Sequence, residues 1–267
     1  MSILLDASAP EGFLVTSFAG DDWRTSRAHI RMLTHTGVSW KGPRSESRNA
    51  RQEGAGARHR SIAEDLWHAA VRVAGSLAEV YLVHRCGELL PEMLDEHVLR
   101  FHPTCPFKAE SGELLLLPAV LAAMTDIHSG TFCGVHRTAL RSDGRGKSDH
   151  PGLGVPKKML GKARGACVKL TRDEEVSCGL HIAEGLETAL ACVGMGFRPV
   201  WAALSAGGIA SFPVLNGIEA ITVFADNDKA GLNAAFACRE RWLAAGREVT
   251  IAVPPHAGFD FADGCTP

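Results

Sequence analysis

Three absences narrow the classes of protein to which this 267-residue chain can belong. The first 85 residues contain no cysteine, and the eight cysteines that follow never form a Cys-x-x-Cys pair, so we expect neither zinc nor a disulfide framework. No Gly-x-x-x-x-Gly-Lys-Ser/Thr motif occurs, which excludes a P-loop helicase motor in this sequence. No apolar run reaches about 18 residues and the N-terminus lacks a basic leader pattern, so we expect a cytoplasmic protein without a membrane segment.

Charge is distributed unevenly along the chain, although the formal net charge is only −2. Residues 134–172 carry ten Lys or Arg against two acids, whereas residues 173–267 carry five against twelve. A basic segment next to an acidic one suits a protein that holds a polyanion near metal cations. A charged face that only contacts solvent is the alternative interpretation.

The C-terminal third alternates apolar runs, typical of buried strands, with amphipathic stretches that are typical of helices. The predicted strands are 181–183, 199–204, 220–225 and 248–253, and the predicted helices are 186–195 and 230–245. Strands and helices that alternate at this spacing predict βαβ units, and therefore a parallel sheet flanked by helices.

Carboxylates follow two of these predicted strands. Glu184 comes directly after the first strand, and Asp226 and Asp228 come after the third. Ligands bind at the carboxyl edge of open parallel sheets, and three acids there repel one another unless cations neutralise them. The pattern predicts a site for Mg²⁺ or Mn²⁺. Alternatively, Glu184 is a first-turn carboxylate and the Asp-x-Asp-x-x-Gly turn is an N-cap.

These residues resemble the Toprim domain, which bacterial-type primases, topoisomerases and some nucleases share. The hallmark is a Glu-Gly after the first strand and an Asp-x-Asp followed by a Gly after the third, here Glu184-Gly185 and Asp226-Asn227-Asp228 with Gly231. The resemblance covers about residues 178–267. It implies that the catalytic and metal-binding acids are Glu184, Asp226 and Asp228.

Further acids within the resemblance extend the expected metal site. Glu187 falls where primase-type members often carry a second acid. Asp260 or Asp263 looks like the late acidic motif after the fourth strand. By resemblance, Glu187 and Asp263 join the expected metal ligands.

Two segments before this domain resemble a pair in the catalytic core of bacterial-type primases. They are residues 134–140 and residues 156–161, with a polar Gly-rich loop between them. The resemblance implies that this part of the chain binds nucleic acid and nucleotide. The residues expected to do so are Arg137, Lys157 and Lys158, and Lys229, directly after Asp228, is a further residue expected to bind nucleic acid or nucleotide.

The sequence therefore predicts an α/β protein in which a small mixed lobe precedes the Toprim domain. We expect a degenerate zinc-ribbon remnant at 1–40 and a flexible linker at 41–60, which has no large aliphatic residue. The primase-like lobe then covers 61–172, with a helix from Ile62 to about His84, and the Toprim domain covers 173–267.

The expected function is that of a primase-like, DNA-dependent nucleotidyl transferase of plasmid or phage type. It would make or extend primers on a single-stranded DNA template from nucleoside triphosphates, with a separate helicase or replication protein as partner. A Toprim nuclease and a non-catalytic accessory protein that binds single-stranded DNA or a partner are the alternatives. The only tyrosine, Tyr81, lies within a predicted helix, which argues against a topoisomerase.

Overall fold

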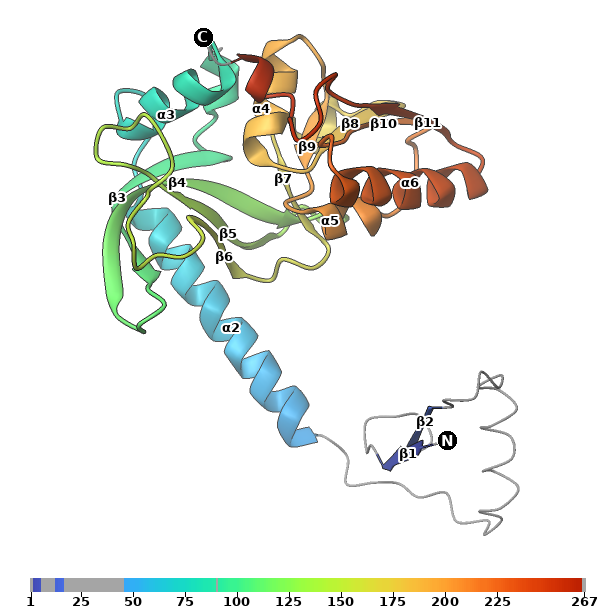
Figure 1. The fold of residues 1–267 in the computed structure, drawn as a ribbon, viewed down its shortest axis with the longest axis horizontal. Helices are drawn as coiled ribbons and strands as arrows, with labels where there is room; N and C mark the ends of the chain where they lie inside the picture. The colour runs from blue at the N-terminus through green and yellow to red at the C-terminus, as the bar shows by residue number, and fades with distance from the viewer. Residues whose placement is uncertain (1, 6–12, 17–45, 90, 266–267) are drawn as a thin grey trace. The chain divides into compact units, whose positions relative to one another are not determined.

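The chain forms two units, residues 1–55 and residues 56–267 (Figure 1). The computed structural model describes residues 2–5, 13–16, 46–89 and 91–265. In the first unit, β1 (Ser2–Leu5) pairs antiparallel with β2 (Phe13–Thr16). The rest of the segment predicted as a zinc-ribbon remnant lies outside the described residues.

One sheet runs through the whole second unit. Among the described residues it has nine strands: β3 (Leu99–Lys108), β4 (Leu114–Asp126), β5 (Phe132–Ala139), β6 (Lys157–Gly161), β7 (Ala166–Lys169), β8 (Gly179–Ala183), β9 (Val200–Ala202), β10 (Ala220–Phe224) and β11 (Glu248–Ala252). Their order is β11-β10-β8-β9-β7-β4-β5-β6, with β3 paired to β4. Strand β7 joins the two lobes, because it pairs antiparallel with both β4 and β9.

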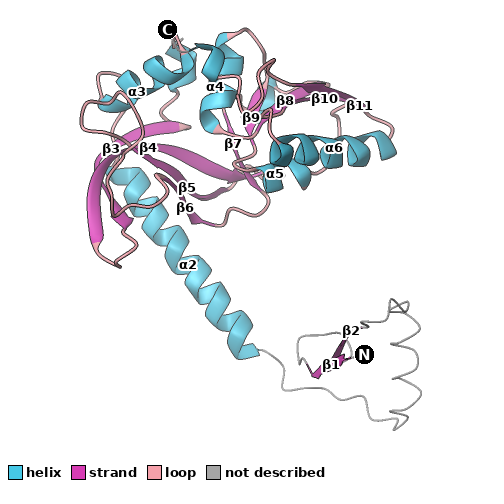
Figure 2. Cartoon of the chain, viewed as in Figure 1, coloured by secondary structure: helices cyan, strands magenta, loops and turns pink. Residues whose placement is uncertain are grey.

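The C-terminal lobe is the predicted parallel sheet flanked by helices. Strands β9, β8, β10 and β11 are mutually parallel. Helix α4 (Leu186–Gly194) packs on one face, whereas α5 (Ala206–Ala210) and α6 (Lys229–Ala244) pack on the other (Figure 2). Alternate residues of each strand point to opposite faces of the sheet. Ile182 and Val223 pack on the side of α5 and α6, whereas Ala183 and Phe224 pack on the side of α4.

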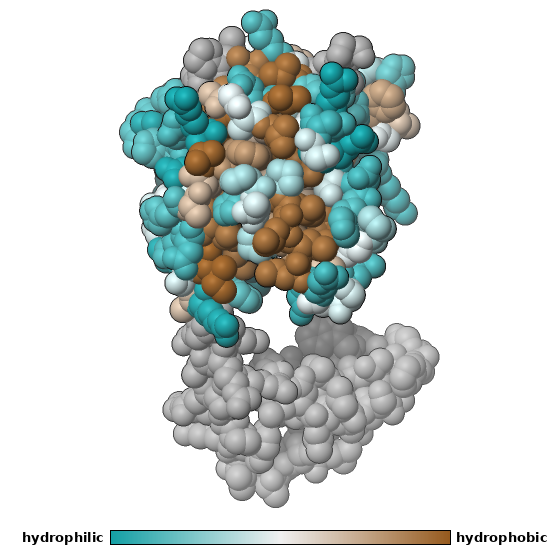
Figure 3. Space-filling model, turned by 90° about the vertical axis from the view of Figure 1, so that its left-hand side faces the viewer, coloured by the Kyte–Doolittle hydropathy of each residue, from teal (hydrophilic) through white to brown (hydrophobic). Residues whose placement is uncertain are grey.

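The N-terminal lobe is an antiparallel sheet of β3, β4, β5 and β6 between two helical layers. Leu66 and Trp67 of α2 (Glu46–Ala69) pack on the face that carries Leu121 of β4. Helix α3 (Leu77–Cys86) packs on the opposite face, against Val120. Apolar side chains reach the surface on the side of the lobe shown in Figure 3.

Two predictions for the part of the chain before β3 are wrong. Helix α2 begins at Glu46, so residues 46–60 are helical where a flexible linker was expected. A lack of large aliphatic residues prevents a core, but Ala, Arg, Glu and Gln still favour helix. The single helix predicted over 62–84 is interrupted, because Val71 forms an isolated β-bridge with Phe101. A second helix, α3, begins at Leu77, and Ser76 is its N-cap, with the hydroxyl accepting a hydrogen bond from the Ala78 amide at 3.1 Å.

No helix in the described ranges is both long enough and apolar enough to cross a membrane.

Candidate functional site

The predicted acids follow two neighbouring parallel strands. Strand β8 ends at Ala183 and β10 ends at Phe224, and these two residues are paired in register. Glu184 and Asp226 therefore leave the sheet at the same edge, with Asp228 two residues further on. The spacing in the sequence predicted this juxtaposition, and the strand register produces it.

The Asp-x-Asp turn is held by its own hydrogen bonds. Asp228 is the N-cap of α6, where its Oδ1 accepts a hydrogen bond from the Gly231 amide at 2.7 Å. A Cβ on Gly231 would lie 2.5 Å from the carbonyl oxygen of Asp226, which explains the glycine of the motif. The capping interpretation thus holds for Asp228. The capping hydrogen bond uses one of the two carboxylate oxygens of Asp228, which is an exposed residue.

Asp226 is the electrostatic centre of the acids. Burial raises its pKa, and the charges of Glu184, Asp260 and Asp228 raise it further, to about 7, although Lys157 opposes the shift. Its Oδ1 is buried and finds no hydrogen-bond partner within the described part of the chain. A buried, unpaired carboxylate oxygen among like charges is an energetically costly arrangement that a cation would relieve.

The carboxylates of Glu184 and Asp226 suit a hard divalent cation, but they supply only part of its coordination shell. Burial, together with the charge of Asp228, raises the pKa of Glu184, against a hydrogen bond from the Ala206 amide that lowers it. Among the residues that the structure describes, no three His, Cys, Asp or Glu side chains converge as a metal-binding group. Mg²⁺ commonly takes one or two protein carboxylates and completes its shell with water and substrate phosphates. Glu184 and Asp226 fit that open type of site.

Glu187, which was expected to be a metal ligand, is hydrogen-bonded to other protein groups instead. It is 2% exposed, in the first turn of α4. The Tyr81 hydroxyl donates to its Oε1 at 2.7 Å, and the Lys157 ammonium donates to its Oε2 at 2.7 Å. Burial alone raises the pKa of Glu187, but Lys157, Lys147 and the Tyr81 hydrogen bond hold it at about 2. Both oxygens are thus already engaged by protein groups.

The two late acids, Asp260 and Asp263, both contact Arg85. Arg85 of α3 donates to both oxygens of Asp260, at 2.9 and 2.7 Å, and its Nη2 lies 3.0 Å from Asp263 Oδ1. The other Asp263 oxygen accepts from the Asp260 amide at 2.8 Å. Asp260 is the one whose charge raises the pKa of Asp226. Asp263, the residue expected as a ligand, instead pairs with Arg85.

The predicted basic residues are divided between the two faces of the sheet. Lys157 and Lys158 are consecutive in β6, so their side chains point in opposite directions. Lys157 turns towards Glu187, whereas the Lys158 ammonium donates to the carbonyl oxygen of Lys108 at 2.7 Å. In the described structure the two ammonium groups therefore have partners on different faces of the sheet.

Arg137 is on the face of Lys158, which it opposes across β5 and β6. It is only 9% exposed, donates to the Pro106 carbonyl oxygen at 2.7 Å, and lies over the Phe107 ring at 5.0 Å. These contacts place most of the Arg137 side chain in the lobe interior, and the phosphate contact expected of it stays a prediction. Lys229 is exposed at the first position of α6.

Sequence reasoning missed the groups around Glu187. Tyr81 is 106 positions away in the chain, and Lys147, whose ammonium is 3.9 Å from Glu187 Oε1, lies in the loop between β5 and β6. His136 is buried nearby, and burial lowers its pKa to about 4. The only signal in the sequence was the positive charge of residues 134–172, which contain Lys147 and His136.

A cavity of about 250 Å³ opens where the two lobes meet. Met159 and residues 163–166 line it from the N-terminal lobe, and residues 203–205 and Phe212 from the C-terminal lobe. Within that lining, Leu204 has a φ of 72°, a conformation that costs energy in a non-glycine residue. The next-but-one residue, Ala206, supplies the amide that faces Glu184.

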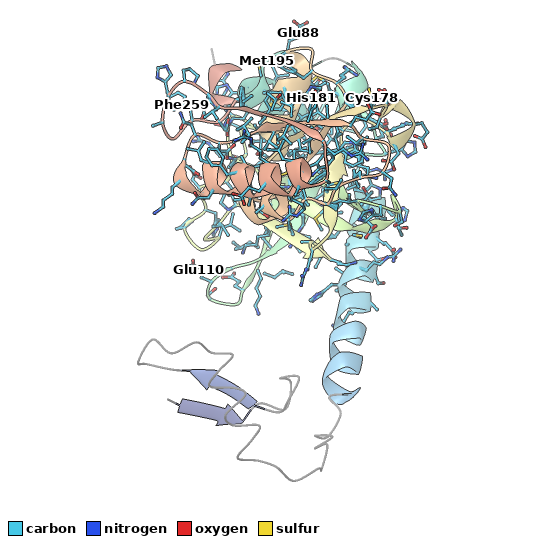
Figure 4. All side chains as sticks on the ribbon, turned by 90° about the vertical axis from the view of Figure 1, so that its right-hand side faces the viewer. Glu88, Glu110, Cys178, His181, Met195 and Phe259 are labelled. Atoms are coloured by element: carbon cyan, nitrogen blue, oxygen red, sulfur yellow. The ribbon has the colours of Figure 1, made fainter. Side chains whose placement is uncertain are left out.

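The loop after β11 is hydrogen-bonded to the turn that carries Asp226 and Asp228. The Asn227 amide donates to the Phe259 carbonyl oxygen at 2.9 Å, and the Gly258 amide donates to the Asn227 carbonyl oxygen at 2.7 Å. The Asn227 side chain donates to the Pro254 carbonyl oxygen at 2.8 Å. Figure 4 shows Phe259 at the edge of the C-terminal lobe, where this loop runs. These bonds fix the residue between the two aspartates.

Comparisons with known proteins agree with this architecture. Residues 57–170 match a domain of unknown function, DUF7146, and residues 179–266 match the Toprim domain family. The comparison with curated proteins found no match.

Two solved structures are similar to most of the chain. The DnaG catalytic core matches at 15% identity with a TM-score of 0.53, over 78% of this chain and 74% of that one. The DnaG primase catalytic domain bound to single-stranded DNA matches at 16% identity with a TM-score of 0.52, over 80% and 77%. At such identities the similarity concerns the fold. Residues 179–266 thus match the Toprim domain family, within a chain whose fold is similar to that of a DnaG catalytic core.

Proposed function

We propose that this protein is a primase-like nucleotidyl transferase that makes or extends primers on single-stranded DNA from nucleoside triphosphates. The observation that supports it most is that Glu184 and Asp226 follow the in-register ends of β8 and β10 at the carboxyl edge of a primase-like Toprim sheet, with Asp226 Oδ1 buried and unpaired among the described residues. The proposal assigns to these two carboxylates the holding of Mg²⁺ or Mn²⁺.

Each residue of the site has a distinct task in this proposal. Glu184 and Asp226 present carboxylate oxygens to the cation. Asp228 caps α6 and so holds the turn that contains Asp226. The Lys157 ammonium, on the opposite lobe, offers a positive charge to a nucleotide phosphate. When bound, the divalent cation neutralises phosphate charge and activates the attacking 3′ hydroxyl.

Single-stranded DNA is the proposed template. The net positive charge of residues 134–172 supports phosphate binding next to the acids. The similar DnaG domain that was solved with single-stranded DNA has the same fold, which supports the proposal without identifying the groove. A separate helicase or replication protein would supply the single strand.

The test is a primer synthesis assay with the full chain, single-stranded template, labelled ribo- or deoxynucleotides and Mg²⁺ or Mn²⁺, with and without a preformed primer. Wild-type protein should lengthen the labelled product, and the Asp226→Asn, Asp228→Asn double variant should not. A matched control, Asp65→Asn with Glu174→Gln, removes the same charge at exposed positions and should retain synthesis.

The same reactions separate the alternatives. Shortening of an end-labelled template in the presence of metal, without any synthesis, would favour a Toprim nuclease. Binding of single-stranded DNA with neither synthesis nor cleavage would favour a non-catalytic accessory protein.

A further inference from the structure

Glu187 is the point where three elements of the N-terminal lobe meet one residue of the C-terminal lobe. Its carboxylate accepts from Tyr81 of α3 and from Lys157 of β6, both at 2.7 Å. Lys147, from the loop before β6, lies 3.9 Å from the same carboxylate. A buried carboxylate with charge-assisted bonds holds its partners firmly, because neither ion can be replaced by water without cost.

Lys157 is close to the acids of the candidate site as well as to Glu187. Its charge lowers the pKa of Glu184 and of Asp226, so its ammonium is within electrostatic reach of both. It is also 4.0 Å from the position that a Cβ on Gly185 would occupy, directly beside Glu184. Lys157 therefore has two competing sets of acceptors, and it is bonded to Glu187.

We infer that Glu187 is a positioning residue that keeps the Lys157 ammonium off Glu184 and Asp226, so that these two carboxylates stay open to a divalent cation. The inference rests on the metal site of the proposed function. Without Glu187, the flexible lysine stem would let the ammonium turn to another acceptor, and the buried Asp226 Oδ1 is an unpaired one that carries negative charge. An ammonium there would occupy the oxygen and repel Mg²⁺ or Mn²⁺.

This role differs from that of a metal ligand in how two substitutions combine. Glu187→Gln should weaken Mn²⁺ binding about tenfold, because the released Lys157 competes for the acids. Lys157→Met should bind Mn²⁺ at least as tightly as wild type, since it removes a positive charge beside the acids. The double variant should bind like Lys157→Met alone. A ligand role predicts instead that the double variant stays as weak as Glu187→Gln.

Calorimetric Mn²⁺ titration of the four full-length proteins measures this cycle, with thermal unfolding to verify that each variant is folded. A distant ion pair provides the matched control: Lys169 and Asp173 are 2.7 Å apart, and Lys169→Met with Asp173→Asn should leave Mn²⁺ affinity unchanged. Weak binding by the double variant, or no Mn²⁺ binding by wild type, would overturn the inference. If the four Mn²⁺ affinities follow the expected pattern but the protein synthesises no primer, the result would count against the proposed function alone.

A measurement on wild-type protein covers the case in which the variants do not fold. Lysine acetylation with peptide mass spectrometry reports the rate at which Lys157 reacts, with Lys158 on the other face as internal reference. If Glu187 anchors Lys157 both with and without metal, Mn²⁺ should not raise that rate. An increase on Mn²⁺ addition would mean that the acids, rather than Glu187, hold the lysine, and would refute the inference.

Discussion

Replacing Tyr81 with Phe removes only the hydroxyl that donates a hydrogen bond to Glu187. Tyr81 is 2% exposed, and its hydroxyl donates to Glu187 at 2.7 Å. Burial, followed by the negative charge of Glu187, raises the pKa of Tyr81, so the hydroxyl keeps its proton and remains a donor at neutral pH. The variant leaves a buried carboxylate with one bond fewer.

The expected cost follows from the type of bond that is lost. A hydrogen bond to a charged group contributes about 1.5–3 kcal/mol. For a folded unit of this size, each kcal/mol corresponds to about 2–4 °C in melting temperature, so Tyr81→Phe should lower it by about 3–12 °C. Urea unfolding at pH 7 gives the free energy, and a thermal scan gives the melting temperature.

The pH dependence provides a second check. Because the folded pKa of Glu187 is lowered to about 2, its charge stabilises the fold above the unfolded value of about 4.5. That contribution is lost as the pH falls from about 4.5 through 2, and the cost of Tyr81→Phe should shrink over the same range.

Thr138 offers a matched control, because its hydroxyl is buried yet has no hydrogen-bond partner within the described residues. Thr138→Val should be neutral or stabilising, since it removes an unsatisfied polar group. If Tyr81→Phe cost no more than Thr138→Val at pH 7, the description of Glu187 as a strongly bonded carboxylate would be refuted.

Four further predictions follow from the site and the fold. Because the pKa of Asp226 is raised from 3.8 to about 7, the stability that its protonation contributes is present below 3.8 and is lost as the pH rises from there through 7. In chelator, Asp226→Asn should raise the melting temperature more at pH 8 than at pH 5, and equal shifts at both would contradict this. Gly231→Ala should destabilise the fold by about 1–3 kcal/mol by urea unfolding, because its Cβ meets a backbone oxygen at 2.5 Å; a neutral effect would mean that the turn can relax. Arg137→Ala should lower the melting temperature, whereas Lys158→Ala should leave it nearly unchanged, and the reverse order would place Arg137 at the surface. A chain limited to residues 56–267 should fold on its own, as calorimetry can establish, because it contains both lobes; loss of cooperative unfolding would disprove that boundary.

The sequence by itself determined the C-terminal sheet and the place of its first acids. Strands β8 and β10 are short, apolar and followed directly by Glu184 and by Asp226, so any parallel pairing of these strands brings the acids to one edge. Helices α4 and α6 were equally readable, because their patterns are local and repeat along one segment.

Only the tertiary structure decided what the remaining charged residues contact. Glu187 has the same charge as Glu184 and lies three residues away, but the turn of α4 directs it to Tyr81 and Lys157, which come from distant parts of the chain. Lys157 and Lys158 read as one basic pair in sequence, yet the pleat of β6 sends them to opposite faces. A local pattern fixes which residues share a strand end or a helix face, whereas the partners of a buried charge depend on which distant elements pack against it.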